Sequence, residues 1–273
     1  MIHHYDFDLF VIGGGSGGVR AARMAGQRGA RVALAECAEL GGTCVNVGCV
    51  PKKLYSYAAG YAAAFEEAPG YGWTLPEAPR FDWATLKRQR AQEITRLNGV
   101  YQKLLDGAGV KTLTGWAQLV DGHTVSVSDT RYTARHILVA TGGMPAAPDM
   151  PGRELAVVSD AMFDLPDFPK RLLVMGGGYI GCEFASLFRG LGAHVTLVNR
   201  GAHILNGFDD DVREALAREM GRQGIDLRMT AQVETLRREG DGLVAMLSRG
   251  QQIEADTVLL ATGRKPNTAG MGL

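Results

Sequence analysis

The feature that most constrains the fold is a pattern of strand, glycine turn, helix and strand that occurs twice in the 273 residues. The first copy runs from the apolar segment 6–12 through Gly13-Gly-Gly-Ser-Gly-Gly18 to the segment 31–35. The second runs from 171–175 through Gly176-Gly-Gly-Tyr-Ile-Gly181 to 194–198. Glycines at this spacing allow a tight turn and let a pyrophosphate approach the helix N-terminus. Two complete copies predict an α/β chain with two Rossmann-like dinucleotide-binding domains. The fingerprint glycines expected at the cofactors are Gly13, Gly15, Gly18, Gly176, Gly178 and Gly181.

Each copy is followed by a β-rich stretch and an exit strand, at 136–141 and at 257–262. The Pro- and Gly-containing segment 144–152 marks a linker. We therefore predict a β-meander inserted in each domain, with the first domain at 1–145 and the second at 146–265. Residues 266–273 are expected to start the return of the chain to the first domain. Segment 81–105 is predicted to be a helix with a buried stripe of Leu86, Ile94, Leu97 and Leu104.

The two copies differ at the residue that ends the second strand. Glu36 ends the first copy and is placed to accept hydrogen bonds from ribose hydroxyls, whereas Asn199 and Arg200 end the second. An arginine can pair with a ribose 2′-phosphate. The sequence therefore predicts an adenosine dinucleotide such as FAD in the first domain and NADPH in the second.

Cys44 and Cys49 lie in the run Gly-Gly-Thr-Cys-Val-Asn-Val-Gly-Cys-Val-Pro-Lys-Lys at 41–53. Such a pair can close a short disulfide and reopen it, and a helix beginning at or within the motif would lower a thiolate pKa. A structural zinc site needs four ligands, and no second Cys or His pair follows at suitable spacing, so no metal is expected. Cys37 and Cys182 are predicted to be packing residues. The pair indicates a redox-active disulfide.

Charge and hydropathy exclude several classes of partner. Lysine plus arginine equals aspartate plus glutamate at 29 each, which argues against nucleic acid or an anionic membrane as the main partner. No apolar stretch approaches the length of a membrane span, and the N-terminus lacks the pattern of a signal peptide. We expect a cytoplasmic protein. In that reducing compartment a cysteine pair is more often catalytic than structural.

The motifs together resemble those of the flavin-dependent pyridine-nucleotide disulfide reductases, over the whole chain. The most specific pieces are the cysteine run at 41–53, Ala-Thr-Gly-Gly-Met-Pro at 140–145, and Gly-Tyr-Ile-Gly-Cys-Glu at 178–183. Among these enzymes the glutathione reductases are the most similar, which implies glutathione disulfide as the substrate. Trypanothione reductases share the double lysine, whereas lipoamide dehydrogenases typically carry serine in place of Lys52 and an acid near Asn199. These enzymes, mercuric reductases and a non-catalytic dinucleotide-binding fragment remain alternatives.

The resemblance implies roles for five catalytic residues. Cys49 is similar to the thiolate that contacts the flavin, and Cys44 to the interchange thiol that attacks the substrate disulfide. Lys52 resembles the lysine beside flavin N5, with Glu183 as its ion-pair partner. Tyr179 resembles the aromatic lid that the nicotinamide displaces.

The resemblance also implies binding residues for three ligands: FAD, NADPH and glutathione. Those for FAD are Ser16, Gly17, Glu36, Thr43, Lys52, Ala117, Thr141, Gly142 and Arg264. Those for NADPH are Gly177, Ile180, Glu183, Arg200 and Gly263, and those for glutathione are Ser16, Arg23 and Tyr101. Asn206 stands where related enzymes often carry a second arginine, so we expect reduced selectivity for NADPH.

Members of this family are homodimers whose interface domain follows the segment matched here. The same later segment supplies the His–Glu pair that protonates the leaving thiolate and part of the FAD site. From the resemblance we expect a partial reductase that retains NADPH binding, holds FAD weakly or not at all, and has little glutathione reductase activity.

Overall fold

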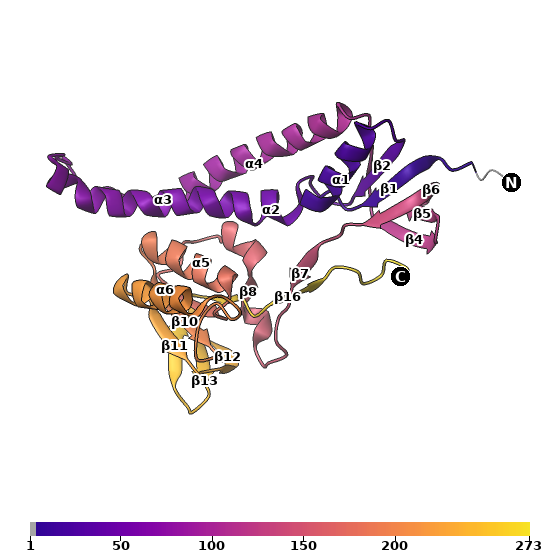
Figure 1. Ribbon diagram of the computed structural model, residues 1–273. Coiled ribbons are helices and arrows are strands. Elements are labelled where there is room, and N and C mark those ends of the chain that lie inside the picture. Colours follow the sequence, from indigo (N-terminus) through magenta and orange to yellow (C-terminus); the bar gives the residue numbers. More distant parts are fainter. Residues whose placement is uncertain (1–3) are drawn as a thin grey trace. The chain divides into compact units, whose positions relative to one another are not determined.

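The computed structural model describes residues 4–273, and Figure 1 shows their helices and strands in chain order. The chain divides into two compact units. The first comprises the residues up to 51, residues 89–144 and residues 265–273; the second comprises residues 52–88 and 145–264. No helix among residues 4–273 is both long enough and apolar enough to cross a membrane.

The first unit is built on a six-stranded sheet with the order β3-β2-β1-β6-β5-β4. Strands β1 (Phe7–Ile12), β2 (Val32–Glu36), β3 (Lys111–Thr114) and β6 (Thr130–Val139) run parallel to one another. Strands β4 (Ala117–Asp121), β5 (Thr124–Val127) and the first part of β6 form an antiparallel meander. Residues 130–133 of β6 pair with β5, and residues 134–139 pair with β1. The predicted meander is therefore present and shares a strand with the nucleotide-binding sheet.

The core of the first unit lies on both faces of this sheet. Val11 of β1 packs with Val19 and Ala22 of α1 (Ser16–Gly26). Phe10 and Ile12 point to the opposite face and pack with residues of the meander and with Met271. Because both faces are covered, the part of β1 from Leu9 to Ile12 is a continuous apolar run rather than an alternating one.

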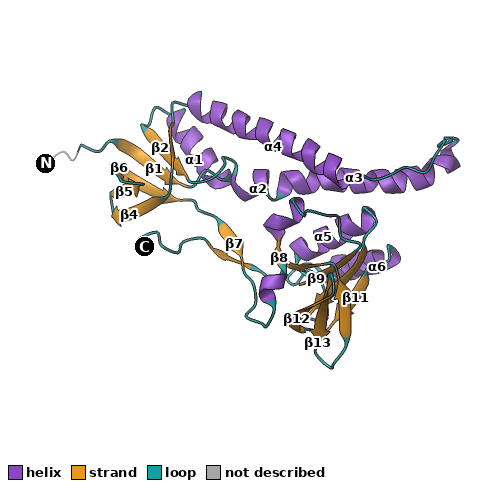
Figure 2. Cartoon of the chain, turned by 180° about the vertical axis from the view of Figure 1, so that it is seen from behind, coloured by secondary structure: helices purple, strands orange, loops and turns teal. Residues whose placement is uncertain are grey.

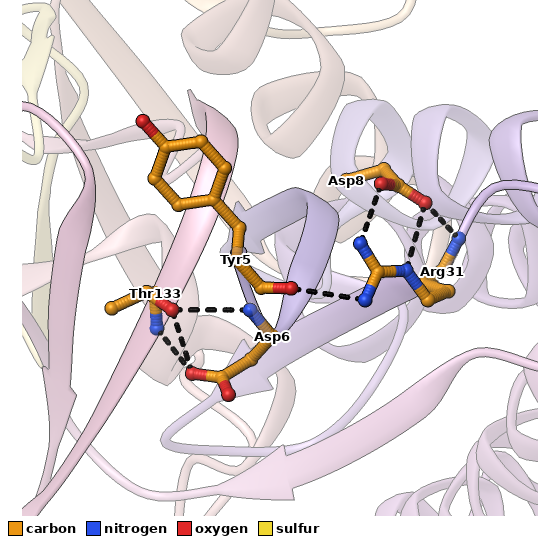
Figure 3. Close-up of polar contacts among 5 residues, drawn as sticks. All are labelled: Tyr5, Asp6, Asp8, Arg31 and Thr133. Atoms are coloured by element: carbon orange, nitrogen blue, oxygen red, sulfur yellow. Dashed lines mark hydrogen bonds and ion pairs between the residues drawn. The ribbon is translucent and has the colours of Figure 1, made fainter. Parts of the chain in front are cut away.

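The start of β1 is fixed by two polar contacts to its neighbours (Figure 3). Asp8 accepts hydrogen bonds from the backbone N–H of Arg31 at 2.9 Å and from its guanidinium at 2.9 and 3.2 Å. Asp6 accepts from the backbone N–H and hydroxyl of Thr133, each at 2.8 Å. The side-chain hydrogen bond with Arg31 is the largest cause that lowers the pKa of Asp8 to about 2. These contacts set the register of β1 against both β2 and β6.

The segment 81–105 forms helix α4 (Trp83–Asp106), as predicted, but its buried stripe ends one residue later than predicted. Ile94 is buried, whereas Leu104 is 38% exposed and Leu105 is fully buried. Eleven residues complete slightly more than three helical turns, so position 105 lies on the same face as position 94, and position 104 is about 80° away from position 94.

The second unit has a parallel five-stranded sheet and a separate three-stranded one. The parallel sheet, in the order β11-β10-β9-β15-β8, consists of β8 (Val157–Val158), β9 (Arg171–Met175), β10 (His194–Asn199), β11 (Asp226–Met229) and β15 (Thr257–Leu260). The helices are α5 (Tyr179–Gly190) and α6 (Asp210–Arg222). Strands β12 (Val233–Glu239), β13 (Gly242–Leu247) and β14 (Gln252–Ala255) form the antiparallel meander (Figure 2). Both parts of the predicted fold class are confirmed.

One long helix, α3, and several short elements complete the chain. They are α2 (Gly42–Asn46), α3 (Cys49–Glu67), η1 (Ala68–Tyr71), η2 (Arg153–Leu155), η3 (Ser159–Phe163), and the paired strands β7 (Gly143–Pro145) and β16 (Arg264–Pro266). In the second unit α3 is anchored by Tyr55, whose buried hydroxyl donates to the carbonyl of Phe163 at 2.7 Å. The Nε1–H of Trp83 donates to the carbonyl of Leu165 at 2.9 Å. These contacts hold the turn of α3 that carries Lys52.

Candidate functional site

The two glycine turns have the same geometry. Gly13 and Gly176 have φ of 107° and 112°, and a Cβ on either would lie 2.4 Å from a carbonyl oxygen of the neighbouring exit segment. A Cβ on Gly18 would lie 1.8 Å from the carbonyl oxygen of Gly13, and one on Gly181 would lie 2.0 Å from that of Gly176. The first and last glycines of each turn are therefore required by backbone geometry and close helix–strand packing.

Both turns fit the pyrophosphate of a dinucleotide. Helices α1 and α5 begin after Gly15 and Gly178, and neither start is capped by a side-chain hydrogen bond. A Cβ on Gly17 or Gly178 would meet no heavy atom within 4 Å, so space remains beside the first helical turn. Uncapped N–H groups at the positive end of a helix dipole suit a phosphate.

Glu36 and Asn199 each bind the middle of a glycine turn. Glu36 accepts hydrogen bonds from the N–H of Gly14 at 2.6 Å and from the N–H groups of Cys37 and Ala38 at 2.9 Å. The Oδ1 of Asn199 accepts from the N–H of Gly177 at 3.1 Å. The loop after Asn199 begins with the exposed Arg200 and extends to the exposed Asn206.

The loop that carries the cysteines packs directly on the first glycine turn. The N–H of Gly41 donates to the carbonyl of Gly14 at 2.8 Å. Gly42 has φ of 58°, and a Cβ there would lie 2.7 Å from the Cα of Gly15. Only a glycine allows the two backbones to approach so closely. The start of the cysteine loop is thereby placed beside the N-terminus of α1.

Cys44 lies in α2, Cys49 is the first residue of α3, and both thiols are free. The pKa of Cys44 is raised, first by partial burial and then by the hydrogen bond and charge of Cys49, while a hydrogen bond with Ser16 opposes the rise. The expectation of a lowered thiolate pKa is therefore wrong for Cys44, because burial and the second thiol outweigh the helix. The contact with Ser16 places one predicted binding residue beside Cys44.

Two asparagines that sequence reasoning missed hold the cysteine loop. The Nδ2 of Asn46 donates to the carbonyl of Gly42 at 2.9 Å. The Nδ2 of Asn98, on α4, donates to the Oδ1 of Asn46 and to the carbonyl of Leu40, both at 2.8 Å. Asn46 lies within the cysteine motif, but no feature of the sequence connects it with a residue 52 positions away.

Lys52 and Glu183 form the ion pair that the resemblance implies. The Nζ of Lys52 lies 2.5 Å from the Oε1 of Glu183, and the two side chains are 29% and 39% exposed. Glu183 lies on α5 one turn after Tyr179, which begins the helix and is 55% exposed. Ile180 is half-buried. The expected pair is present, and the flavin-related role of its residues stays a prediction.

Most of the remaining predicted cofactor residues lie at strand ends, and one lies on a helix. Ala117 is buried at the start of β4, Thr141 is half-buried, and Gly142 accepts at its carbonyl from the N–H of Asn267 at 3.0 Å. In the second unit the carbonyl of Gly263 accepts from the N–H of Ala146 at 2.9 Å. Thr43 is exposed on α2 and Arg264 is half-buried in β16.

The predicted glutathione residues of the first unit surround the cysteine loop only in part. Ser16 contacts Cys44, whereas Tyr101 packs against the apolar cluster around Val19. Arg23 lies farther along α1, and its Nε is buried with no hydrogen-bond partner among residues 4–273. A buried unpaired donor costs free energy, so Arg23 is a reasonable contact for an anionic ligand.

The other two cysteines differ from each other. Cys37 is exposed, so its prediction as a packing residue is wrong, because β2 ends one residue earlier and leaves it in a loop. Cys182 is buried in α5, and burial raises its pKa to about 11. Among the described residues no group of three or more His, Cys, Asp or Glu side chains could hold a metal ion.

Comparisons with known proteins agree with this geometry. Residues 7–273 match the family described as pyridine nucleotide-disulphide oxidoreductase. The chain is 49% identical over 269 residues to a glutathione reductase of Burkholderia cepacia, 44% over 271 residues to one of Nostoc sp., and 42% over 280 residues to a chloroplastic/mitochondrial one of Pisum sativum. Each match covers 98% of this chain but only 60%, 59% and 51% of the relative. The chain thus spans about half to three fifths of the length of these relatives.

Proposed function

Because the chain belongs to the pyridine nucleotide-disulphide oxidoreductase family, we propose that it is part of an NADPH-dependent flavoprotein disulfide reductase that reduces glutathione disulfide. The observation that carries the proposal is the packing of the Cys44–Cys49 loop on the first glycine turn, through Gly41 and Gly42. A cysteine pair beside such a turn would lie close to a bound redox dinucleotide, which would supply electrons. The relatives named glutathione reductase support the choice of substrate.

Glutathione reductases use FAD and NADPH, and the fit of both glycine turns supports the same pair here. We assign FAD to residues 1–145 with the return segment 266–273, and NADPH to residues 146–265. Bound FAD would supply the two-electron transfer between NADPH and the cysteine pair. Glu36 and the first turn would hold its adenosine diphosphate part, and Arg200 would pair with the 2′-phosphate of NADPH.

The cysteines perform thiol–disulfide exchange. The Cys44 thiolate attacks one sulfur of glutathione disulfide, which forms a mixed disulfide and releases one glutathione thiolate. The Cys49 thiolate then attacks the Sγ of Cys44, releases the second glutathione and closes the Cys44–Cys49 disulfide. Two electrons from NADPH and two protons restore the dithiol, so the balance is NADPH, H⁺ and glutathione disulfide giving NADP⁺ and two glutathione molecules.

The elevated pKa of Cys44 has a consequence for this exchange. The thiol needs a base to become the attacking thiolate, and the groups that favour the charged form are the backbone N–H of Cys49 and, to a smaller extent, the side chain of Ser16. Attack by Cys44 is therefore expected to accelerate with increasing pH. The Lys52–Glu183 pair orients one ammonium group, which we propose to place beside the flavin as a stabiliser of negative charge.

The proposal is tested by alkylation of the cysteines followed by mass spectrometry. The chain, supplied with FAD, is oxidised with glutathione disulfide, treated with NADPH without oxygen, and then alkylated. We expect Cys44 and Cys49 to be protected after oxidation and alkylated after NADPH, whereas the exposed Cys37 stays alkylated in both samples. Cys44→Ser should stop the cycle. Cysteines that respond to dithiothreitol but not to NADPH with FAD would contradict the proposal.

The substrate, assembly and location are finer parts of the same proposal. Trypanothione disulfide, lipoamide and mercuric ion, offered as oxidants in the alkylation assay, separate glutathione reduction from the related activities. We propose a homodimer and a cytoplasmic location for the whole protein, although the name of the pea relative places that protein in chloroplasts and mitochondria. Light scattering and cell fractionation test these two statements.

A further inference from the structure

Asn199 occupies the same structural position in the second unit as Glu36 in the first. Each ends the second strand of its strand–helix–strand copy, and each side-chain oxygen accepts from the N–H of the middle glycine, Gly14 or Gly177. A Cβ on Gly14 would lie 3.1 Å from the Oε2 of Glu36, and one on Gly177 would lie 2.9 Å from the Cγ of Asn199. The two side chains therefore fill the same space against their turns.

The two side chains differ in what their other end binds. The second oxygen of Glu36 accepts from two backbone N–H groups. The Nδ2 of Asn199 instead donates to the carbonyls of Gly201 at 3.1 Å and His203 at 2.8 Å. A carboxylate has no proton to donate to a carbonyl, so only an amide supports this arrangement. The loop after β10 thus turns its carbonyls toward residue 199.

These bonds tie the loop 200–206 to the glycine turn. The N–H of Leu205 donates to the carbonyl of Gly177 at 2.6 Å, and the N–H of Thr230 donates to that of Gly201 at 3.2 Å. Ile204 and Leu205 are buried, while Arg200 at the start of the loop is exposed. Both Nδ2 protons of Asn199 are already used, so this side chain cannot donate to a phosphate without releasing the loop.

We propose that Asn199 is a positioning residue that sets the preference for a 2′-phosphorylated adenosine ribose. It holds the loop in the conformation that presents Arg200, and its neutral amide replaces the carboxylate that would select a free 2′-hydroxyl. The inference rests on the proposed binding of NADPH, and it adds a residue that does not touch the phosphate. The loop is held by an amide rather than by the ligand, so Arg200 is pre-organised before the nucleotide arrives.

The test compares two probes, adenosine 2′,5′-bisphosphate and 5′-AMP, by calorimetric titration of the chain and its variants. Asn199→Ala removes the bonds to the loop without adding a charge. We expect it to raise the Kd for the bisphosphate by about fivefold to tenfold and to change the Kd for 5′-AMP less than about twofold. Asn199→Asp keeps the acceptor for Gly177 but sets a carboxylate against two carbonyls, so its loss should be tenfold or more.

Hydrogen exchange supplies a readout that does not depend on the nucleotide. Backbone amides of 201–205 should exchange at least tenfold faster in Asn199→Ala than in the unchanged chain. Asn206→Ala, at the exposed far end of the same loop, is the matched control and should keep their protection. If Asn199→Ala weakens the binding of both probes equally, the claim of specificity is overturned. Asn199→Asp, which retains the bond to Gly177, must likewise weaken binding of the bisphosphate more than binding of 5′-AMP.

Arg200→Ala separates this inference from the function on which it rests. If Arg200→Ala weakens the bisphosphate but Asn199→Ala does not, the positioning role of Asn199 is wrong and the 2′-phosphate site stands. If Arg200→Ala also leaves the bisphosphate unchanged, the proposed recognition of NADPH fails, and the inference fails with it.

Discussion

The strongest stability prediction concerns two neighbouring glycines of α1. Gly18→Ala places a Cβ 1.8 Å from the carbonyl oxygen of Gly13, whereas real Cβ atoms essentially never come within 3.0 Å of another heavy atom. The carbonyl belongs to the backbone of the glycine turn, so no flexible side chain can move aside. The helix must shift away from β1, and the packing of Val19 and Ala22 must loosen with it.

The magnitude follows from two opposing terms. Alanine in a helix is favoured over glycine by about 1 kcal/mol. Overpacking against a fixed backbone costs about 1–3 kcal/mol, and here at least the upper value because the overlap exceeds that of an added methylene. We therefore expect Gly18→Ala to lower the free energy of unfolding by about 2 kcal/mol or more, which corresponds to a fall in Tm of roughly 4–8 °C.

Gly17→Ala is the matched control, because a Cβ on Gly17 would meet no heavy atom within 4 Å. The helix term alone then applies, and the variant should be unchanged or up to about 1 kcal/mol more stable. Urea unfolding of the cofactor-free chain, followed by far-ultraviolet circular dichroism, measures both variants. Equal stabilities of Gly17→Ala and Gly18→Ala would refute the reasoning from helix–turn contact.

Three further outcomes follow from contacts already described. The pKa of Asp8 in the folded chain is about 2 and its ordinary value is 3.8, so the stability that its carboxylate contributes is present above pH 4 and lost as the pH falls toward 2. The free energy of unfolding of Asp8→Asn, measured in urea, should therefore differ from that of the unchanged chain at pH 6 and converge with it at low pH. Cys182, with a pKa of about 11, should resist iodoacetamide at pH 8 while the exposed Cys37 is modified, and equal labelling would contradict its burial. Asn98→Ala should lower the free energy of unfolding by about 1–3 kcal/mol and speed alkylation of Cys44, because it removes the hydrogen bonds to the carbonyl of Leu40 and to Asn46 that hold the cysteine loop. An unchanged rate of alkylation would argue against this role of Asn98.

The parts of the fold that the sequence predicted are those with a local physical cause. The glycine turns require particular φ values and close backbone approach, so the positions of Gly13 and Gly176 are visible in the pattern itself. The prediction of the buried stripe of α4 was wrong at its C-terminal end, because Leu104 and Leu105 are adjacent leucines. Only the phase of the helix decides which one is buried.

The parts that could not be predicted depend on contacts between distant segments. The pair Asn46–Asn98 joins a loop to a helix, and the bonds of Asn199 depend on how the following loop turns. The pKa of Cys44 depends on burial and on a neighbouring thiol, both of which oppose the local effect of the helix. An ion pair such as Lys52–Glu183 was foreseen only through the resemblance to known reductases, not from spacing.

The two meanders differ in how strongly each is coupled to the parallel sheet of its own unit, because only the first shares a strand, β6, with that sheet. In the first unit one continuous strand is hydrogen-bonded to β5 along residues 130–133 and to β1 along residues 134–139. Unfolding of that meander disturbs the pairing of β6 with β1, so the meander and the parallel sheet should unfold in a single cooperative event. In the second unit the meander is a separate sheet joined to its neighbour by apolar packing of residues such as Leu173 and Leu243. Evolution or an engineer can therefore exchange that meander for another insert with far less disturbance to the strands that carry the nucleotide turn.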